Sequence, residues 1–155
     1  MALAGHYPRS SVRALIVQNG KVLVNRCERE GETYYLLPGG GQDHQEDLET
    51  ALRREIKEEV GCEIKINELV FVFDYIGAKD PNKLANPHFH AVHHIFWCEL
   101  VDPENLGKNC LMDTNQTGHE WLPLNQLEEF KFYPKQIIPS LQNPKEAKLY
   151  LGSLI

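Results

Sequence analysis

The feature that most constrains how this 155-residue chain folds is a helical segment from about Glu46 to Val60 that carries acidic side chains on its apolar side. Apolar residues recur at every fourth position of the segment: Leu48, Leu52, Ile56 and Val60. Gly61 is placed to end the helix. At about 100° per residue, Glu59 falls inside the arc of these apolar residues, and we expect its side chain to project between core-facing residues.

Three carboxylates, those of Glu55, Glu58 and Glu59, share an arc of about 100° on this helix. Like charges three or four residues apart destabilise a helix by roughly 0.2–0.5 kcal/mol per pair. Acidic groups in the last turn also face the negative end of the helix dipole, at roughly 0.3–1 kcal/mol each, and Arg54 and Lys57 offset only part of this. Such consistent violation of local rules is typical of a functional site, and carboxylate oxygens are the ligands that Mg²⁺ and Mn²⁺ prefer. A solvated acidic face is the alternative.

The residues around the helix decide between these alternatives. Residues 40–62 follow the pattern G-x5-E-x7-R-E-I-x-E-E-x-G-C. This segment resembles the Nudix box, whose pattern is Gly, five residues, Glu, seven residues, Arg-Glu, an aliphatic residue, any residue, Glu-Glu, any residue, Gly and an aliphatic residue. At an average usage of about 6% each, a chance match of the seven specified residues has odds of roughly 10⁻⁶ in such a chain. The one departure is Cys62 in the final aliphatic position, and a free cysteine behaves as a small hydrophobe.

The resemblance implies an α/β fold, the Nudix-type α/β/α sandwich with a mixed β-sheet between helices, in a single domain over residues 1–155. The order of elements agrees, because strands precede, flank and follow one central helix without regular βαβ alternation. Asn19-Gly20 suits the type I′ turn of a hairpin, and Pro38 with the three glycines after it is expected to end the third strand. We expect strands at 12–18, 21–26, 34–37, 68–76, 89–101 and 121–124, and helices at 46–60, 125–130 and 134–141.

By resemblance, Glu55, Glu58 and Glu59 are ligands of a divalent cofactor, Mg²⁺ or Mn²⁺, and one of them serves as general base. The Gly40 carbonyl would complete the metal shell, since glycine lets the backbone approach closely. The chemistry explains these residue types. A pyrophosphate carries concentrated negative charge, so its hydrolysis needs metal ions that neutralise phosphate oxygens and activate a water, and a carboxylate that takes a proton.

Arg54 belongs to the expected catalytic set because its guanidinium fork suits the orientation of a carboxylate within the box, for example that of Glu46. Glu46 could equally be an ordinary first-turn residue that the helix dipole favours. Outside the box, Asp113 and Glu120 are candidates for a further acidic group, because their segment resembles the loop and strand that close the site in the family. A solvated role is the alternative for both.

The candidate substrate-binding residues are Arg26, Tyr35 and Glu120. Arg26 ends the second strand near the expected cleft and could hold a phosphate, although a surface arginine is equally plausible there. Tyr34 and Tyr35 alternate in direction, so one should lie in the core while the other is free to stack on a base. The histidines at 88, 90 and 94 span roughly 20 Å of strand, which is too far for one ion, and we expect them to line a pocket or an exposed strand face.

The expected reaction is hydrolysis of the pyrophosphate bond in a nucleoside diphosphate linked to another moiety, with an ADP-ribose-like compound ahead of a modified nucleoside triphosphate. A catalytically idle Nudix domain that senses nucleotides is the alternative. The expected partner is therefore a small-molecule nucleotide, and the resemblance leaves a homodimer open.

Composition excludes several other classes. The net charge of −6 argues against stable nucleic-acid binding, which relies on clustered basic residues. No apolar run approaches the roughly 20 residues of a membrane helix, and residues 1–9 have no apolar core of a secretory signal. We therefore expect a cytoplasmic protein whose four cysteines are thiols instead of disulfides.

Overall fold

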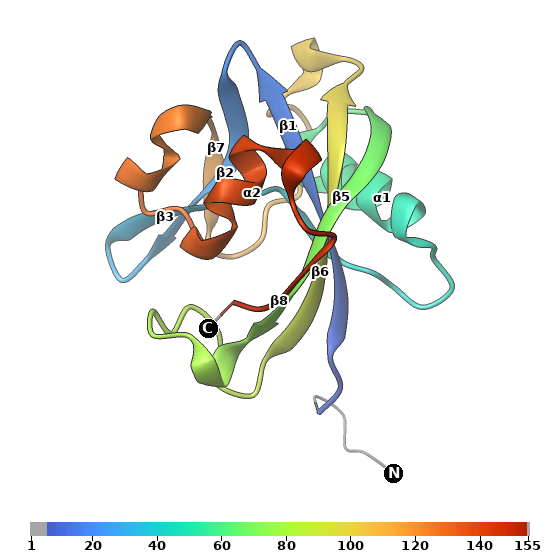
Figure 1. Cartoon of the computed structure of the whole chain (residues 1–155). Helices are drawn as coiled ribbons and strands as arrows, with labels where there is room; N and C mark the ends of the chain where they lie inside the picture. The colour runs from blue at the N-terminus through green and yellow to red at the C-terminus, as the bar shows by residue number, and fades with distance from the viewer. Residues whose placement is uncertain (1–5, 155) are drawn as a thin grey trace.

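The computed structural model describes residues 6–154, so the expectation about the N-terminal residues falls partly outside it. Its strands are β1 (Arg9–Gln18), β2 (Lys21–Arg29), β3 (Glu32–Leu36), β4 (Gly39–Gly41), β5 (Ile64–Ile76), β6 (His90–Leu100), β7 (Gln116–Pro123) and β8 (Tyr150–Ser153). Its α-helices are α1 (Leu48–Val60) and α2 (Ile138–Gln142), joined to the strands by loops and short 3-10 turns (Figure 1). No helix within the described range combines the length and apolar character that a membrane crossing requires.

The strands form one mixed sheet in the order β3-β2-β1-β6-β5-β8, with β4 paired to β1 and β7 paired to β2. β1 and β6 run parallel, as do β5 and β8, and the other pairs are antiparallel. The predicted hairpin between β1 and β2 is confirmed. Gln18 pairs with Lys21, and both turn residues between them have positive φ, 51° at Asn19 and 74° at Gly20.

Alternation along β1 separates two hydrophobic cores. Val12, Ala14 and Ile16 point to one face, where they pack with the buried side of α1. Leu15 points to the other face, where its core includes three residues from the α2 region: Ile137, Ile138 and Leu141. Since α1 and α2 cover opposite faces of the sheet, the predicted α/β fold with a mixed sheet between helices is confirmed (Figure 1).

Element boundaries differ from the expectation where helix capping or pairing with a distant strand decides them. Helix α1 begins at Leu48 because Asp47 caps it, with its carboxylate accepting from the backbone N–H of Thr50 at 2.7 Å. The glycines after Pro38 form a short strand instead of a loop, because β4 pairs with Ser11, Val12 and Arg13 of β1. Strand β8 was not expected, because it is short and pairs with β5, which is distant in the sequence. The expected helix at 134–141 is a 3-10 turn followed by α2, and that at 125–130 is a 3-10 segment.

The approach of β4 to β1 requires glycine at position 39. Gly39 has φ of 144°, a conformation that side chains rarely adopt, and a Cβ there would overlap the backbone carbonyl of Val12. The same strand carries the Gly40 carbonyl and lies against α1. The position of β4 therefore determines how the backbone of residues 39–41 meets the acidic side of the helix.

We predict that Gly39→Ala lowers the free energy of unfolding by roughly 2–4 kcal/mol, the sum of the backbone strain at positive φ and the overlap with Val12. Urea denaturation measures this value. Gly31→Ala is the matched control, because Gly31 also has positive φ, 79°, but open space around its Cβ position, so only the strain of roughly 1 kcal/mol applies. Equal losses in the two variants would contradict the packing argument.

Candidate functional site

The acidic side of α1 meets β4 through the buried carboxylate of Glu59, which is 4% exposed. Its Oε1 accepts from the backbone N–H of Gly39 at 2.7 Å, and its Oε2 accepts from Asn25 Nδ2 at 3.3 Å. Burial raises the pKa of Glu59 to about 7, against the opposing effects of Arg13 and of the Gly39 N–H. The prediction that Glu59 projects into the interior is confirmed.

Glu55, on the same helix, also contacts β4. A Cβ at Gly40 would overlap the Glu55 carboxylate, so this carboxylate rests directly on the glycine backbone. Burial raises the pKa of Glu55, although the hydrogen bond from Arg54 opposes the shift. The Gly40 carbonyl accepts a hydrogen bond from Ser11 Oγ at 3.1 Å, and Gly40 pairs with Val12 of β1.

Arg54 organises the remaining carboxylates of the box. Its Nε and Nη2 donate to the two oxygens of Glu46 at 2.8 and 2.9 Å, a bidentate pair that lowers the pKa of Glu46 to about 2. Its Nη1 lies 3.0 Å from Glu55 Oε1 and 3.4 Å from Glu58 Oε2. Nη2 also donates to the Gly41 carbonyl at 3.0 Å. The sequence left open whether Glu46 contacts Arg54 or is an ordinary first-turn residue, and in the structure Glu46 contacts Arg54.

The oxygen atoms at this site suit a hard divalent cation whose remaining ligands come from water or substrate. Within residues 6–154, no three His, Cys, Asp or Glu side chains converge closely enough to hold an ion alone. Mg²⁺ is usually bound through one or two carboxylates together with waters and substrate phosphates. Glu55 contacts β4 at Gly40, and Glu59 contacts it at Gly39. Glu58 has a more exposed side chain, at 41%.

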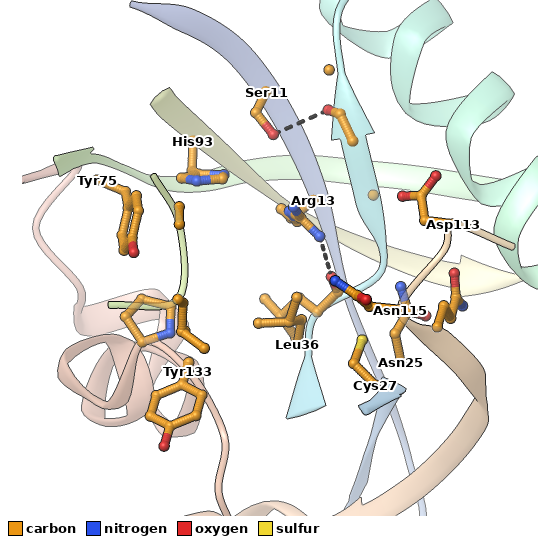
Figure 2. A pocket seen from close by; sticks show the side chains of 18 of the residues that line it. Ser11, Arg13, Asn25, Cys27, Leu36, Tyr75, His93, Asp113, Asn115 and Tyr133 are labelled. Carbon is orange, nitrogen blue, oxygen red and sulfur yellow. Dashed lines mark hydrogen bonds between the residues drawn. The ribbon is translucent and has the colours of Figure 1, made fainter. Parts of the chain in front are cut away.

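A cavity of about 520 Å³ opens beside Glu59 and β4 (Figure 2). Figure 2 shows Arg13 near its centre, with Asp113 and Asn25 on one side and His93 and Tyr75 on the other. The Arg13 Nη1 atom donates to the Leu37 carbonyl at 2.7 Å. The cavity therefore has an acidic end at α1, a central guanidinium and an end with aromatic walls.

Arg13 was not among the residues expected at the site, but a signal for it exists in the sequence. Arg9, Ser11 and Arg13 occupy alternate positions of β1, between the apolar residues that pack on α1. All three line the cavity. Period-two alternation of this kind places a row of polar groups on one face of a strand.

Strand direction places Arg26, Tyr35 and Glu120 away from the cavity. Arg26 pairs with Tyr35, and its Nη1 donates to Glu120 Oε1 at 3.1 Å. Tyr35 packs edge-on against Phe130 and joins the core on the α2 side. The tyrosine that lines the cavity is Tyr34. Among the expected residues outside the box, Asp113 does line the cavity, and its charge contributes to the raised pKa values of Glu55 and Glu59.

The histidines of β6 have separate environments. The ring Nε2 of His90 lies 2.7 Å from Asp74 Oδ1, and Nδ1 of His94 lies 2.9 Å from the Ser11 carbonyl. His88 is exposed before the strand begins. His93, which alternation along β6 places on the opposite face from His90 and His94, lines the cavity.

Comparison with known proteins identifies the class. The family model of the NUDIX domain matches residues 7–141, so the chain belongs to the NUDIX family and is a Nudix pyrophosphohydrolase. This family generally uses divalent metal ions. The ADP-ribose pyrophosphatase of Methanocaldococcus jannaschii is 27% identical over 133 residues, 85% of this chain and 72% of that protein.

Solved structures agree with the fold. A NUDIX hydrolase from Nitrosomonas europaea superposes with a TM-score of 0.71 at 18% identity and covers 93% of both chains. A MutT NUDIX hydrolase from Burkholderia pseudomallei gives a TM-score of 0.61 at 26% identity, over 77% of this chain and 85% of that one.

We predict that Arg54→Lys lowers the melting temperature by roughly 3–6 °C, because lysine cannot make the bidentate pair and leaves Glu46, Glu55 and Glu58 without their shared donor. Differential scanning calorimetry measures the shift. Arg53→Lys is the matched control: Arg53 is the adjacent arginine, and its Nη1 donates to the Ile64 carbonyl at 2.7 Å, away from the carboxylates. A loss in the control as large as in Arg54→Lys would contradict the assigned role.

Proposed function

We propose that the chain hydrolyses the pyrophosphate bond of a nucleoside diphosphate linked to another moiety, with Glu55, Glu58 and Glu59 as the acidic residues of the reaction. The observation that carries this proposal is the buried Glu59 carboxylate at the end of the cavity. Its pKa is raised by desolvation, so a bound cation would supply the charge that the protein interior lacks. The products are a nucleoside monophosphate and a phosphorylated second moiety.

We propose Mg²⁺, or Mn²⁺ in its place, as the ion, held by Glu55, Glu58, Glu59 and the Gly40 carbonyl. When bound, it neutralises phosphate oxygens and lowers the pKa of a water. The protein's own groups have distinct roles beside it. Gly39 N–H and Asn25 orient the Glu59 carboxylate, and Arg54 holds Glu55 and Glu58 with its remaining donor. One of the three glutamates accepts the proton of the attacking water.

Arg13 is proposed as the phosphate-binding residue of this chain. Its guanidinium lies between the acidic end and the aromatic end of the cavity, where a diphosphate that joins two moieties would pass (Figure 2). One Nη atom is engaged by the Leu37 carbonyl, which orients the fork and leaves other N–H groups for phosphate oxygens.

An ADP-ribose-like substrate is supported by the name of the Methanocaldococcus jannaschii relative and by the size of the cavity, which suits a nucleotide. Modified nucleoside triphosphates are the second candidate in a substrate screen. We also propose a cytoplasmic location. The four cysteines are free thiols, which agrees with a reducing compartment: Cys27, Cys62, Cys98 and Cys110.

We predict that Glu59→Gln lowers kcat for the best pyrophosphate substrate by at least about 100-fold, because it removes a charge that the ion and the water require. The assay measures mononucleotide release from ADP-ribose, other nucleoside diphosphate compounds and nucleoside triphosphates, with Mg²⁺ and with Mn²⁺. Glu49→Gln is the matched control, since Glu49 lies in the first turn of the same helix and is exposed; we expect its activity within about twofold of wild type.

Full activity in Glu59→Gln would overturn the proposed mechanism. No turnover of any pyrophosphate compound with either ion would favour an idle nucleotide-sensing domain. Thermal melting with and without the ion measures ion binding directly, because an ion present at 100 times its Kd for the folded state adds roughly 2.7 kcal/mol of stability. Wild type should gain this stability when the ion is added, and Glu59→Gln should not.

We further predict that Arg13→Lys lowers kcat/KM about tenfold or more, since lysine keeps the charge but loses the planar fork. Arg26→Lys is the matched control, because Arg26 contacts Glu120 and Thr117 on the other face of the sheet. Steady-state kinetics with the best substrate measures both variants. A larger loss in Arg26→Lys would return the phosphate site to Arg26.

A further inference from the structure

Unpartnered polar atoms gather in the cavity. Within the described part of the chain, the buried side-chain atoms without a hydrogen-bond partner are Asn25 Oδ1, His93 Nδ1 and Gln116 Oε1. All three residues line the cavity. Because an unpartnered buried polar atom costs stability, this concentration points to a ligand or ordered water that supplies the partners.

The three atoms do not belong to one end of the cavity. Asn25 is tied to the acidic end, since its Nδ2 donates to Glu59. Gln116 is held by His119, with 3.1 Å between its Nε2 and the ring Nε2. His93 lies across the cavity from Asn25, beside Tyr75 and beyond Arg13 (Figure 2).

The surroundings of His93 form a rigid aromatic wall. Its ring stacks on Phe73, with centroids 4.9 Å apart, and meets the edge of Tyr75 at 6.4 Å. The Tyr75 hydroxyl donates to the buried Asp80 at 2.5 Å, and Asp80 also accepts from the backbone N–H of Leu84. These contacts hold both the ring of Tyr75 and the loop that contributes Leu84 to the cavity.

His93 is an uncharged imidazole in this wall. Burial and the nearby Arg13 lower the pKa of His93 to about 3. A neutral imidazole has one nitrogen that donates and one that accepts. Its Nδ1, which has no hydrogen-bond partner among the described residues, therefore offers a ligand an uncharged polar contact.

We propose that His93 determines substrate specificity by forming hydrogen bonds with the edge of a planar heteroaromatic base, whose faces contact the aromatic wall. The inference rests on the proposed function, because it assigns the base of the proposed nucleotide substrate to the His93 end. Arg13 then lies between the base and the acidic end of the cavity, where the proposed diphosphate would pass.

A base fits this end better than a sugar. Leu84, Ala85 and Phe89, from the segment that follows Tyr75, are apolar and line the cavity, and the Phe89 ring contacts that of Tyr75. A sugar would bring several hydroxyl groups that each need a partner, and Tyr75 already donates its hydroxyl proton to Asp80. A base has two apolar faces and only a few polar atoms along its edge, which one imidazole can satisfy.

Equilibrium binding without metal tests the inference. Isothermal titration calorimetry compares AMP, GMP, UMP and CMP with ribose 5-phosphate, which has no base. Wild type should prefer one or two of the nucleotides. His93→Phe keeps an aromatic ring on Phe73 but removes both nitrogens, so the preferred nucleotide should bind about tenfold more weakly while ribose 5-phosphate binds unchanged. His93→Gln should recover part of the preference.

His90→Gln is the matched control, because His90 lies on the same strand but pairs with Asp74; it should bind like wild type. Equal losses for all four nucleotides and ribose 5-phosphate in His93→Phe, or no preference among bases in wild type, would overturn the inference. If His93→Phe does not fold, wild type is titrated with analogues of the preferred nucleotide that each lack one polar edge group. A loss of about tenfold for at least one analogue supports the inference, and equal affinity for all of them overturns it.

The hydrolysis assay separates this inference from the proposed function. If no pyrophosphate compound is turned over but base preference still depends on His93, the proposed reaction is wrong and the specificity site stands. If ADP-, GDP-, UDP- and CDP-linked substrates are hydrolysed with the same kcat/KM by wild type and by His93→Phe, the reaction stands and the specificity site is wrong.

Discussion

The burial of the Glu59 carboxylate between α1 and β4 is the constraint on which the rest of the site depends. A carboxylate taken out of water must find hydrogen bonds and positive charge nearby, and here Gly39 N–H, Asn25 and Arg13 provide them. The Gly39 N–H reaches Glu59 only because glycine lets β4 lie against Val12 of β1. The helix, the short strand and the sheet are therefore held in one arrangement around the Glu59 carboxylate, whose burial would be unfavourable without partners from the short strand and the sheet.

The chain limits repulsion among its glutamates by dividing them between two arginines. Arg54 contacts Glu46, Glu55 and Glu58 on the partly exposed side of α1, whereas Arg13 acts on Glu59 from the cavity. Glu55 and Glu59 both remain in contact with β4. The divalent ion proposed above would offset the remaining repulsion among the acidic residues at the unfavourable end of the helix.

Local sequence patterns predicted the parts of the molecule that local physics controls. The Asn19-Gly20 hairpin, α1 and the inward direction of Glu59 follow from turn chemistry and from helical periodicity. Strand β8 and the pairing of β4 could not be predicted in this way, because both depend on partners that are distant in sequence. The candidate substrate residues depended on strand direction. Whether Tyr34 or Tyr35 lines the cavity is decided by pairing with β2, where Tyr34 lies opposite Cys27.

The arrangement separates chemistry from specificity. Glu55, Glu58 and Glu59 lie on α1, from which Glu59 lines one end of the cavity, while the aromatic wall comes from β5, β6 and the loops beside them. Substitutions in that wall can change the moiety that binds without moving the carboxylates, since the wall residues and the glutamates lie on different elements. This explains why the box identifies the reaction class and carries no information about the substrate. Residues of the wall such as His93, which no motif marks, are where the identity of the substrate has to be sought.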